Sequence, residues 1–372
     1  MNEVYYSLGL MSGTSGDGVD ASIIKSDGEN HYKVILDNYF KYDQKIFENI
    51  HDLKEKINNS TDLKILSKDI QILEKEITLF HSKIVNEIMD EFNKNIDFIG
   101  FHGQTIFHKS KEKISKQLGD AKLLSQLTKK IVVYSFRKND LSNGGEGAPL
   151  ASIFHQLIAK QNKIDLPVCF LNIGGIANIT LIKSHKTKDI KSYDIGPGNC
   201  LIDKWIRIKT KKKYDNNGLI AQSGRTSKII LNQALDNFHN IKKLNNLSFD
   251  IKDFDLNFVR GLSLEDGAST LTEFSARIIE DDLSNLLVKD GKTLCKILVC
   301  GGGRKNATLM KLIKKKNLIL QPIDDYGVNG DFVESQAFAY LAIRSFLNLP
   351  ISFPNTTGCK EPCVGGIIIN NF

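Results

Sequence analysis

The chain has 372 residues, of which 41% are hydrophobic and 25% are charged. A chain of this length folds into about two to three domains, and its composition excludes both a disordered protein and a small scaffold that depends on disulfide or metal staples. The net charge of +7 does not indicate a nucleic-acid partner, because only 7 of the 50 basic residues are arginine and the lysines are scattered along the chain.

The first elements of the chain are predicted from alternation and helical spacing. Residues 5–10 and 19–24 alternate and are rich in strand formers, which predicts a β-hairpin with a glycine-rich turn. Residues 44–95 contain no Gly or Pro and carry apolar residues at helical spacing, which predicts one or two long helices. Short strands are expected at 98–101, where the strand ends before His102, and at 131–134.

The second half opens with the same architecture as the first. Residues 168–173 and 177–182 are predicted strands joined by Gly174-Gly175, and a third strand at 191–195 ends in Gly196-Pro-Gly. Because each half begins with strand, glycine turn and strand, we expect a duplicated α/β domain. Later elements are helices at 200–208, 268–287 and 334–347, a strand at 296–300, and a tail at 356–372 that pairs back onto a sheet.

Three further features bear on the class of protein. No apolar stretch approaches the length of a membrane span, and the N-terminus lacks the pattern of a secretory signal, so we expect a cytoplasmic protein with no membrane partner. The six cysteines show no CxxC pair. Cys359 and Cys363 are separated by three residues, and no histidine pair follows them at zinc-ligand spacing, so reduced structural thiols are expected.

Four glycine-rich turns follow predicted strands, and such strand ends bind ligands in open α/β sheets. Glycine allows the backbone to approach a phosphate closely and to aim successive N–H groups at it. Each turn alone could be only a tight turn, but four at equivalent places favour a nucleotide site. The turns are residues 13–18, 174–175, 196–198 and 301–303.

The type of nucleotide site follows by exclusion. The first turn has neither the order of a dinucleotide-binding fingerprint nor that of a Walker loop, and a strand follows it rather than a helix. A hairpin-type phosphate clamp remains, in which the hydroxyls of Ser12, Thr14 and Ser15 cradle phosphates together with backbone amides. Asp17 or Asp20 is placed to hold Mg²⁺ directly or through water.

An acid–base group is expected near these turns. Asp194 ends a strand before a rigid glycine–proline turn, so it is the candidate base, and a helix cap or turn carboxylate is the alternative. His102 could contact a ligand or cap its strand. Weaker candidates are Asp120, Asp140, Glu146 and Glu334.

The motifs together resemble one family over nearly the whole chain. They include GLMSGTSGDGVD (9–20), FHGQT (101–105), FRKNDLSNGGEGAPL (136–150), LNIGGIANIT (171–180), YDIGPGN (193–199) and CGGGRKNATLM (300–310). In order and spacing this set is similar to the anhydro-N-acetylmuramic acid kinases, which are members of the acetate and sugar kinase/Hsc70/actin superfamily.

The resemblance implies a two-lobed, actin-like ATPase fold, that is, a duplicated ribonuclease-H-like fold with nucleotide and sugar in the interlobe cleft. The implied lobes are residues 1–135 with about 352–372, and residues 136–351. Asp194 is implied as the base that activates water, and His102, Gln104 and Glu334 as sugar-side residues. The implied ATP-binding residues are Ser12, Gly13, Thr14, Ser15, Gly16, Asp17, Gly18, Val19, Asp20, Gly174, Gly175, Gly301, Gly302 and Gly303.

The implied reaction phosphorylates O6 of 1,6-anhydro-N-acetylmuramic acid with ATP and Mg²⁺ while water opens the anhydro bridge, during cell-wall recycling. A homodimer is left open. The chain departs from the family pattern at Gly16, Ser135 and Glu146, and most strongly at 250–255, which reads DIKDFD. Two alternatives therefore stand beside this function: a kinase of the same superfamily for another small sugar or acid, and an actin-like nucleotide-binding regulator without turnover.

Overall fold

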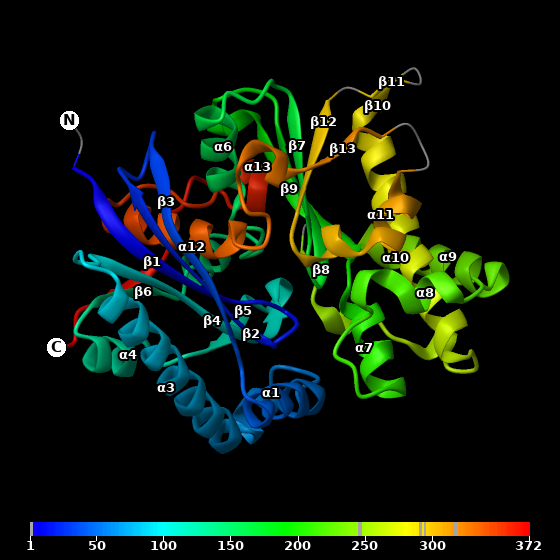
Figure 1. Ribbon diagram of the computed structural model, residues 1–372, viewed down its shortest axis with the longest axis horizontal. Helices are drawn as coiled ribbons and strands as arrows, with labels where there is room; N and C mark the ends of the chain where they lie inside the picture. The colour runs from blue at the N-terminus through cyan, green and yellow to red at the C-terminus, as the bar shows by residue number, and fades with distance from the viewer. Residues whose placement is uncertain (1–2, 245–247, 290–291, 294, 315–317) are drawn as a thin grey trace. The chain divides into compact units, whose positions relative to one another are not determined.

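The computed structural model describes residues 3–244, 248–289, 292–293, 295–314 and 318–372. The chain divides into two compact units, the first made of residues 1–163 and 332–372 and the second of residues 164–331. Each unit has its own sheet, and Figure 1 labels the elements of both.

Within the described residues, the first unit contains a seven-stranded sheet in the order β14-β6-β4-β1-β2-β3, with β5 added beside β4. The hairpin strands β1 and β2 are antiparallel, and so are β2 and β3, whereas β4 and β6 continue the sheet parallel to β1. The C-terminal β14 pairs with β6, which confirms that the tail returns to a sheet. The strands are β1 (Tyr5–Ser12), β2 (Gly18–Ser26), β3 (Tyr32–Lys41), β4 (Phe98–Lys109), β5 (Ile114–Leu118), β6 (Ile131–Tyr134) and β14 (Ile367–Ile369).

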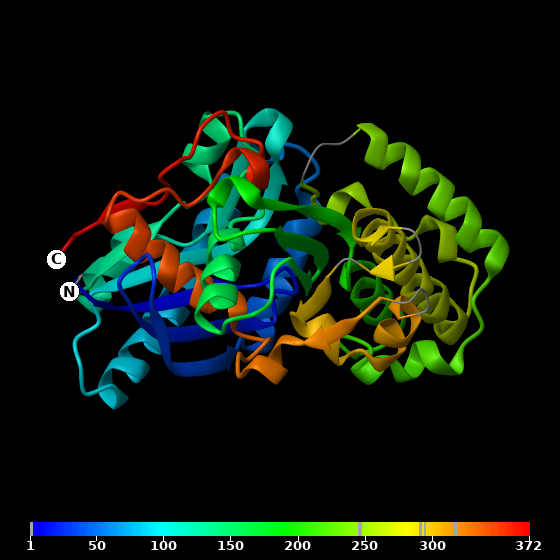
Figure 2. The same ribbon diagram turned by 90° about the horizontal axis from the view of Figure 1, so that it is seen from above.

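Helix α12 (Val333–Phe346) lies directly on the strands of the first sheet (Figure 2). A Cβ on Gly9 of β1 would meet the Ser335 carbonyl oxygen at 1.9 Å, and one on Gly100 of β4 would meet the Phe338 carbonyl oxygen at 2.2 Å. Glycine at these two positions therefore lets the helix backbone touch the strands. The other helices of this unit are α1 (Gln44–Lys56), α2 (Asp62–Ile65), α3 (Ser67–Glu91), α4 (Ala121–Thr128), α5 (Lys138–Ser142), α6 (Ser152–Gln161) and α13 (Pro354–Thr357).

The second unit contains a five-stranded sheet in the order β13-β12-β7-β8-β9, as far as the chain is described. Strand β7 is antiparallel to β8, β8 is antiparallel to β9, and β12 and β13 continue parallel to β7. This is the order and direction of β3-β2-β1-β4-β6 in the first unit, so the predicted duplication and α/β fold class are confirmed. The strands are β7 (Val168–Ile173), β8 (Ile176–Ile182), β9 (Ile190–Pro197), β12 (Lys296–Cys300) and β13 (Leu320–Pro322), with a separate ribbon of β10 (Val288–Lys289) and β11 (Lys292–Thr293).

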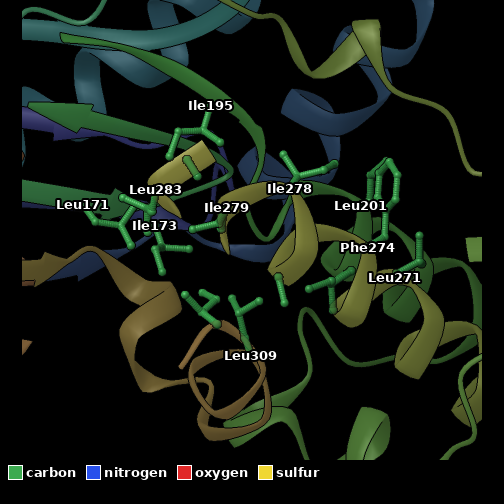
Figure 3. Close-up of a cluster of buried hydrophobic side chains, with 14 of the residues drawn as sticks. Leu171, Ile173, Ile195, Leu201, Leu271, Phe274, Ile278, Ile279, Leu283 and Leu309 are labelled. Carbon is green, nitrogen blue, oxygen red and sulfur yellow. The ribbon is translucent and has the colours of Figure 1, made fainter. Parts of the chain in front are cut away.

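A single apolar core joins this sheet to helix α10 (Leu264–Leu287) (Figure 3). Ile173 and Ile195 from the strands and Ile279 and Leu283 from α10 are fully buried. Burial of such side chains stabilises the unit by about 1.5–3 kcal/mol each. The remaining helices are α7 (Cys200–Lys209), α8 (Leu219–Ser223), α9 (Lys228–Leu244) and α11 (Ala307–Ile313).

The observed units differ from the predicted lobe boundaries in two segments. Residues 136–163 and 332–351 group with the first unit. The physical reason is the contact of α12 with β1, β2 and β4 described above, together with a hydrogen bond from the Tyr32 backbone N–H to the Gln161 side chain at 2.8 Å. Among the described residues, no helix has the length and apolar character that would let it span a membrane.

Candidate functional site

A cluster of buried polar side chains holds the first glycine turn in place. Ser12 Oγ lies 2.7 Å from Gln104 Oε1 and 3.0 Å from the Gly18 carbonyl oxygen. Gln104 Nε2 donates to the Gly13 carbonyl oxygen at 3.0 Å, and the Tyr42 hydroxyl lies 3.1 Å from Ser12 Oγ. Gln104 of the neighbouring strand β4 therefore holds the start of the turn, and Ser12 joins that start to the end of the turn at Gly18. Gln104 is fully buried in this role, and its implied contact with a sugar stays a prediction.

The outer part of this turn carries the residues that are predicted to bind phosphate and Mg²⁺. Gly16 has φ of +62°, which favours glycine there. Asp17 contacts the Ser15 hydroxyl with one carboxylate oxygen, and its other oxygen accepts from the Tyr39 hydroxyl at 3.1 Å. Asp20 follows on β2, partly exposed. Two carboxylates on a turn that is predicted to bind phosphates fit Mg²⁺, because this ion takes one or two carboxylates together with phosphate oxygens.

The remaining predicted residues of this turn contribute backbone rather than side chain. The Thr14 carbonyl oxygen accepts from Lys54 Nζ at 3.0 Å, and the Ser15 carbonyl oxygen lies 3.0 Å from His51 Nε2. Both donors come from α1, which therefore packs against the outside of the turn. The Val19 side chain is buried in the core of the first unit, so only its backbone can face a ligand.

Two turns of the second unit bond to each other at the carboxyl ends of β7 and β9. The Gly198 and Cys200 backbone N–H groups donate to the Gly175 carbonyl oxygen at 2.9 and 3.1 Å, and the Asn199 N–H donates to the Gly174 carbonyl oxygen at 2.9 Å. A Cβ on Gly198 would lie 2.4 Å from the Gly174 oxygen, so this approach requires glycine. The two turns consequently form one rigid backbone surface.

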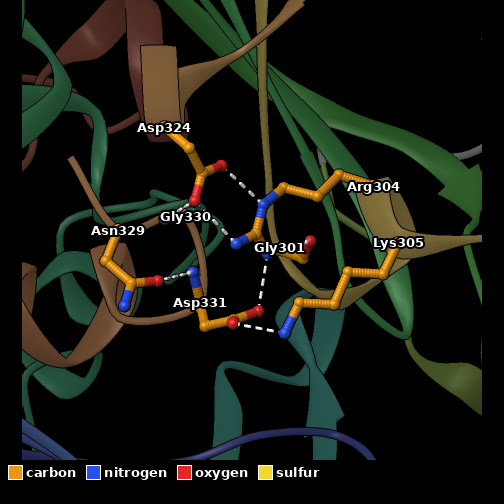
Figure 4. A network of polar contacts seen from close by, with 7 residues as sticks. All are labelled: Gly301, Arg304, Lys305, Asp324, Asn329, Gly330 and Asp331. Carbon is orange, nitrogen blue, oxygen red and sulfur yellow. Dashed lines mark hydrogen bonds and ion pairs between the residues drawn. The ribbon is translucent and has the colours of Figure 1, made fainter. Parts of the chain in front are cut away.

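The third turn of this edge, Gly301–Gly303, is held by an ion-pair network (Figure 4). The Arg304 guanidinium makes two hydrogen bonds to Asp324, at 2.8 and 3.0 Å, and bonds Asp331 at 2.5 Å and the Gly301 carbonyl oxygen at 3.1 Å. Burial alone would lower the pKa of Arg304, but its bonds to the two carboxylates raise it above its usual value. Arg304 therefore stabilises the conformation of this turn.

Some glycines in these turns are required by packing, whereas others leave space. A Cβ on Gly303 would meet Ile173 Cγ2 at 2.2 Å, so the chain itself requires glycine there. At Gly13, Gly174 and Gly302, by contrast, a Cβ would meet no heavy atom closer than 3.5 Å. These three open positions all follow strand ends, which is the arrangement expected when a ligand, and not the protein, approaches the backbone.

Asp194 lies at the same edge of the second sheet and is 6% exposed. A β-bulge between β8 and β9 pairs Asp194 with Asn178, and the next residue, Ile195, points into the core. The Phe249 backbone N–H donates to Asp194 Oδ2 at 3.0 Å, which orients the carboxylate. Sequence reasoning missed Phe249. It directly precedes the divergent segment 250–255, which therefore adjoins the candidate base.

In the first unit, His102 and Glu334 come together around Arg137. Arg137 Nη2 lies 2.9 Å from His102 Nε2, and the Phe338 ring packs on the imidazole with centroids 4.5 Å apart. Glu334 is one helical turn before Phe338 on α12. Arg137 was not among the predicted site residues, although its place in the FRKND motif was a usable signal.

The protonation states of this group follow from burial. Burial lowers the pKa of His102 to about 3, and the Arg137 charge acts in the same direction. Burial raises the pKa of Glu334, against the opposing effect of Arg137. His102 is therefore neutral at physiological pH. Its Nδ1 lies 2.8 Å from the Gly103 carbonyl oxygen and donates to it, so Nε2 accepts from Arg137.

His102 owes its position to an irregularity in β4 that the sequence prediction did not include. The strand continues to Lys109, well past the expected end at 101, with a bulge opposite Leu10 and Met11 of β1. Gly103 has φ of +73° there, and a Cβ on it would meet the Leu118 carbonyl oxygen at 2.2 Å. Bulges of this kind turn a side chain out of the regular alternation.

A cavity of about 280 Å³ lies beside His102. Its other lining groups include Ser135, Lys116 and Asp120. Asp120 accepts from the first backbone N–H groups of α4 at 2.9 and 3.0 Å, so this weaker candidate is a helix cap. The weaker candidate Glu146 accepts from the Ser110 hydroxyl at 3.0 Å.

Sequence comparisons place these features among known proteins. A sequence model of the family described as anhydro-N-acetylmuramic acid kinase matches residues 5–371. The anhydro-N-acetylmuramic acid kinase of Pelagibacter ubique (strain HTCC1062) is 58% identical over 100% of both chains. That of Zymomonas mobilis subsp. mobilis is 38% identical over 97% of this chain and 99% of its own.

Among solved structures, the activator of the 2-hydroxyisocaproyl-CoA dehydratase from Clostridium difficile with bound ADPNP is 11% identical. It covers 92% of this chain and 96% of its own, with a TM-score of 0.42.

Proposed function

This chain belongs to the anhydro-N-acetylmuramic acid kinase family, and from that premise we propose that it uses ATP to phosphorylate O6 of 1,6-anhydro-N-acetylmuramic acid. In the same reaction water opens the anhydro bridge, which gives N-acetylmuramic acid 6-phosphate for cell-wall recycling. The observation that carries the proposal is Asp194, a buried carboxylate oriented by a backbone N–H at the ligand-binding edge of the second sheet.

A single carboxylate is sufficient for this chemistry. Asp194 takes a proton from water as the water oxygen bonds to C1 and the C1–O6 bond breaks. O6 needs no acid because it bonds to the γ-phosphorus of ATP as the bond to ADP breaks. Phosphoryl transfer itself depends mainly on positioning and charge neutralisation.

The glycine turns supply that positioning in the proposed mechanism. The open backbone at Gly13 and Gly174 would face phosphate oxygens, and the open backbone at Gly302 would face the nucleoside. Asp17 and Asp20 would hold Mg²⁺, which neutralises charge on the phosphates. In the first unit, His102 and Glu334 would contact the sugar. His102 would act as a neutral hydrogen-bonding group there and not as an acid, because burial holds its pKa near 3.

The experiment is a reaction with Mg-ATP and the anhydro sugar in ¹⁸O-labelled water. We expect one ADP for each sugar phosphate, with the label at C1 and the phosphate on O6. Phosphorylated product without label at C1 would contradict the coupled mechanism. Omitting ATP is the control, since opening of the bridge without ATP would show that hydrolysis is independent of phosphoryl transfer.

The contact between Phe249 and Asp194 brings the divergent segment 250–255 beside the base and gives the alternative substrate a structural basis. A panel of other small sugars and acids, monitored by ADP release, therefore accompanies the main reaction. Faster turnover of a sugar without an anhydro bridge would favour another kinase of the superfamily. ATP binding with no ADP release from any member would favour a regulator.

A further inference from the structure

Two cysteines that the proposed reaction does not use lie together with a buried aspartate. Asp140, Cys359 and Cys363 each offer one ligand atom, and these atoms all lie within 4.8 Å of one another. The three residues are 1–3% exposed. The sequence did not predict this cluster, because the two cysteines lack zinc-finger spacing and Asp140 is distant from them along the chain.

We propose that these three residues form a Zn²⁺ site in the first unit. Two thiolates and a carboxylate are a ligand set that Zn²⁺ takes, with Zn–S near 2.3 Å and Zn–O near 2.0–2.2 Å. In a tetrahedron these lengths separate the ligand atoms by about 3.5–3.8 Å. The observed upper limit of 4.8 Å between the ligand atoms is compatible with these separations after small side-chain movements at most. Each thiol gives its proton to solvent on ligation.

The carboxylate is already oriented by its neighbours. The Thr357 hydroxyl donates to Asp140 Oδ1 at 2.6 Å, and the Gly147 backbone N–H donates to Oδ2 at 2.7 Å. Carboxylate oxygens have two acceptor sites each, so both can keep these bonds while one also ligates an ion. Hydrogen bonds of this kind orient metal ligands and tune their affinity.

The two segments that carry the ligands are also bonded to each other directly. The Lys360 backbone N–H donates to the Asn143 carbonyl oxygen at 3.2 Å, and the Glu146 N–H donates to the Thr357 carbonyl oxygen at 2.8 Å. Cys363 pairs with Ser352 in an isolated β-bridge. These bonds join the segments that carry the ligands, and three protein ligands leave a fourth coordination position for water.

The test uses Co²⁺ as a spectroscopic probe on the reduced, chelator-treated full chain. We expect one Co²⁺ per chain, a thiolate-to-cobalt charge-transfer band in the near ultraviolet, tetrahedral d–d bands, and loss of all of them when Zn²⁺ is added. Cys359→Ser and Cys363→Ser should each remove the part of the charge-transfer band that comes from the substituted sulfur. Each should also weaken Co²⁺ binding. Cys295→Ser removes a buried thiol in the second unit and is the matched control, which leaves the bands unchanged.

Two measurements on the unaltered chain cover the case in which a variant fails to fold. Zn²⁺ should raise Tm, and it should protect two of the six thiols from a disulfide reagent. Absence of the cobalt bands at saturating Co²⁺, or bands that survive both serine substitutions, would overturn the proposal. A chain that shows only four reactive thiols after denaturation, and all six after reduction, would also overturn the proposal, because Cys359 and Cys363 would then form a disulfide.

Discussion

Replacing Asp194 with asparagine removes the proposed base while keeping the shape of the side chain. General-base catalysis contributes about 10²- to 10⁴-fold to a rate, so we expect Asp194→Asn to lower kcat by about that factor. The amide oxygen of asparagine can still accept the hydrogen bond that the Phe249 N–H donates to Asp194 at 3.0 Å. The stability of the second unit should therefore change little.

Asp194→Ala separates the chemical role from the structural one. Alanine offers no acceptor, so the Phe249 N–H, which bonds Asp194 in a buried setting, loses its partner. An unsatisfied buried donor costs about 1–3 kcal/mol, and each 1 kcal/mol lowers Tm by about 2–4 °C in a unit of this size. Both variants should be equally inactive, but only the alanine variant should melt earlier.

The assay combines ADP release in steady state with ¹⁸O incorporation at C1, together with calorimetric binding of a non-hydrolysable ATP analogue. Nucleotide binding should be unchanged in Asp194→Asn. Asp189→Asn is the control, because it makes the same change of charge at the opposite end of β9, where Asp189 accepts from the Ser184 hydroxyl. A kcat for Asp194→Asn within about tenfold of the unaltered chain would refute Asp194 as the base.

Three further predictions follow from the turns and the buried histidines. Gly302→Ala has space for its Cβ and should keep Tm while raising KM for ATP, whereas Gly303→Ala would place its Cβ 2.2 Å from Ile173 and should lower Tm. Equal effects on Tm would contradict the assignment of the open position to a ligand. Arg304→Met removes the guanidinium from two partly exposed carboxylates, Asp324 (41%) and Asp331 (29%), and should cost about 1 kcal/mol by urea unfolding, because solvent screens such ion pairs. An unchanged urea midpoint would contradict a structural role for the network. His102 has a pKa near 3 in the folded chain, below the value of about 6.5 expected on unfolding, so the unfolded chain binds a proton that the folded chain does not. Stability should therefore fall as pH decreases from 7 to 5, and His102→Gln should reduce the slope by up to about 1.4 kcal/mol per pH unit. A slope that the substitution does not alter would show that His102 is not buried in its neutral form.

Local signals were sufficient for much of the fold. The bounds of β6, β7 and β12 agree with the strands predicted from their apolar runs, because such runs end at turn residues that the sequence displays directly. The glycine turns and the duplicated order of strands were predictable for the same reason. Helices α4 and α9 were not predicted.

Within the candidate site, the sequence alone indicated the residues proposed to carry the chemistry, because Asp194 and the glycine turns lie in continuous motifs. Only the tertiary structure decided what holds those residues in place. The Phe249 N–H reaches Asp194 from a distant loop, and a bulge in β4 aims His102 toward Arg137. Asp140 meets Cys359 and Cys363 in the same way. Such contacts depend on how whole elements pack, and no local propensity in the chain encodes that packing.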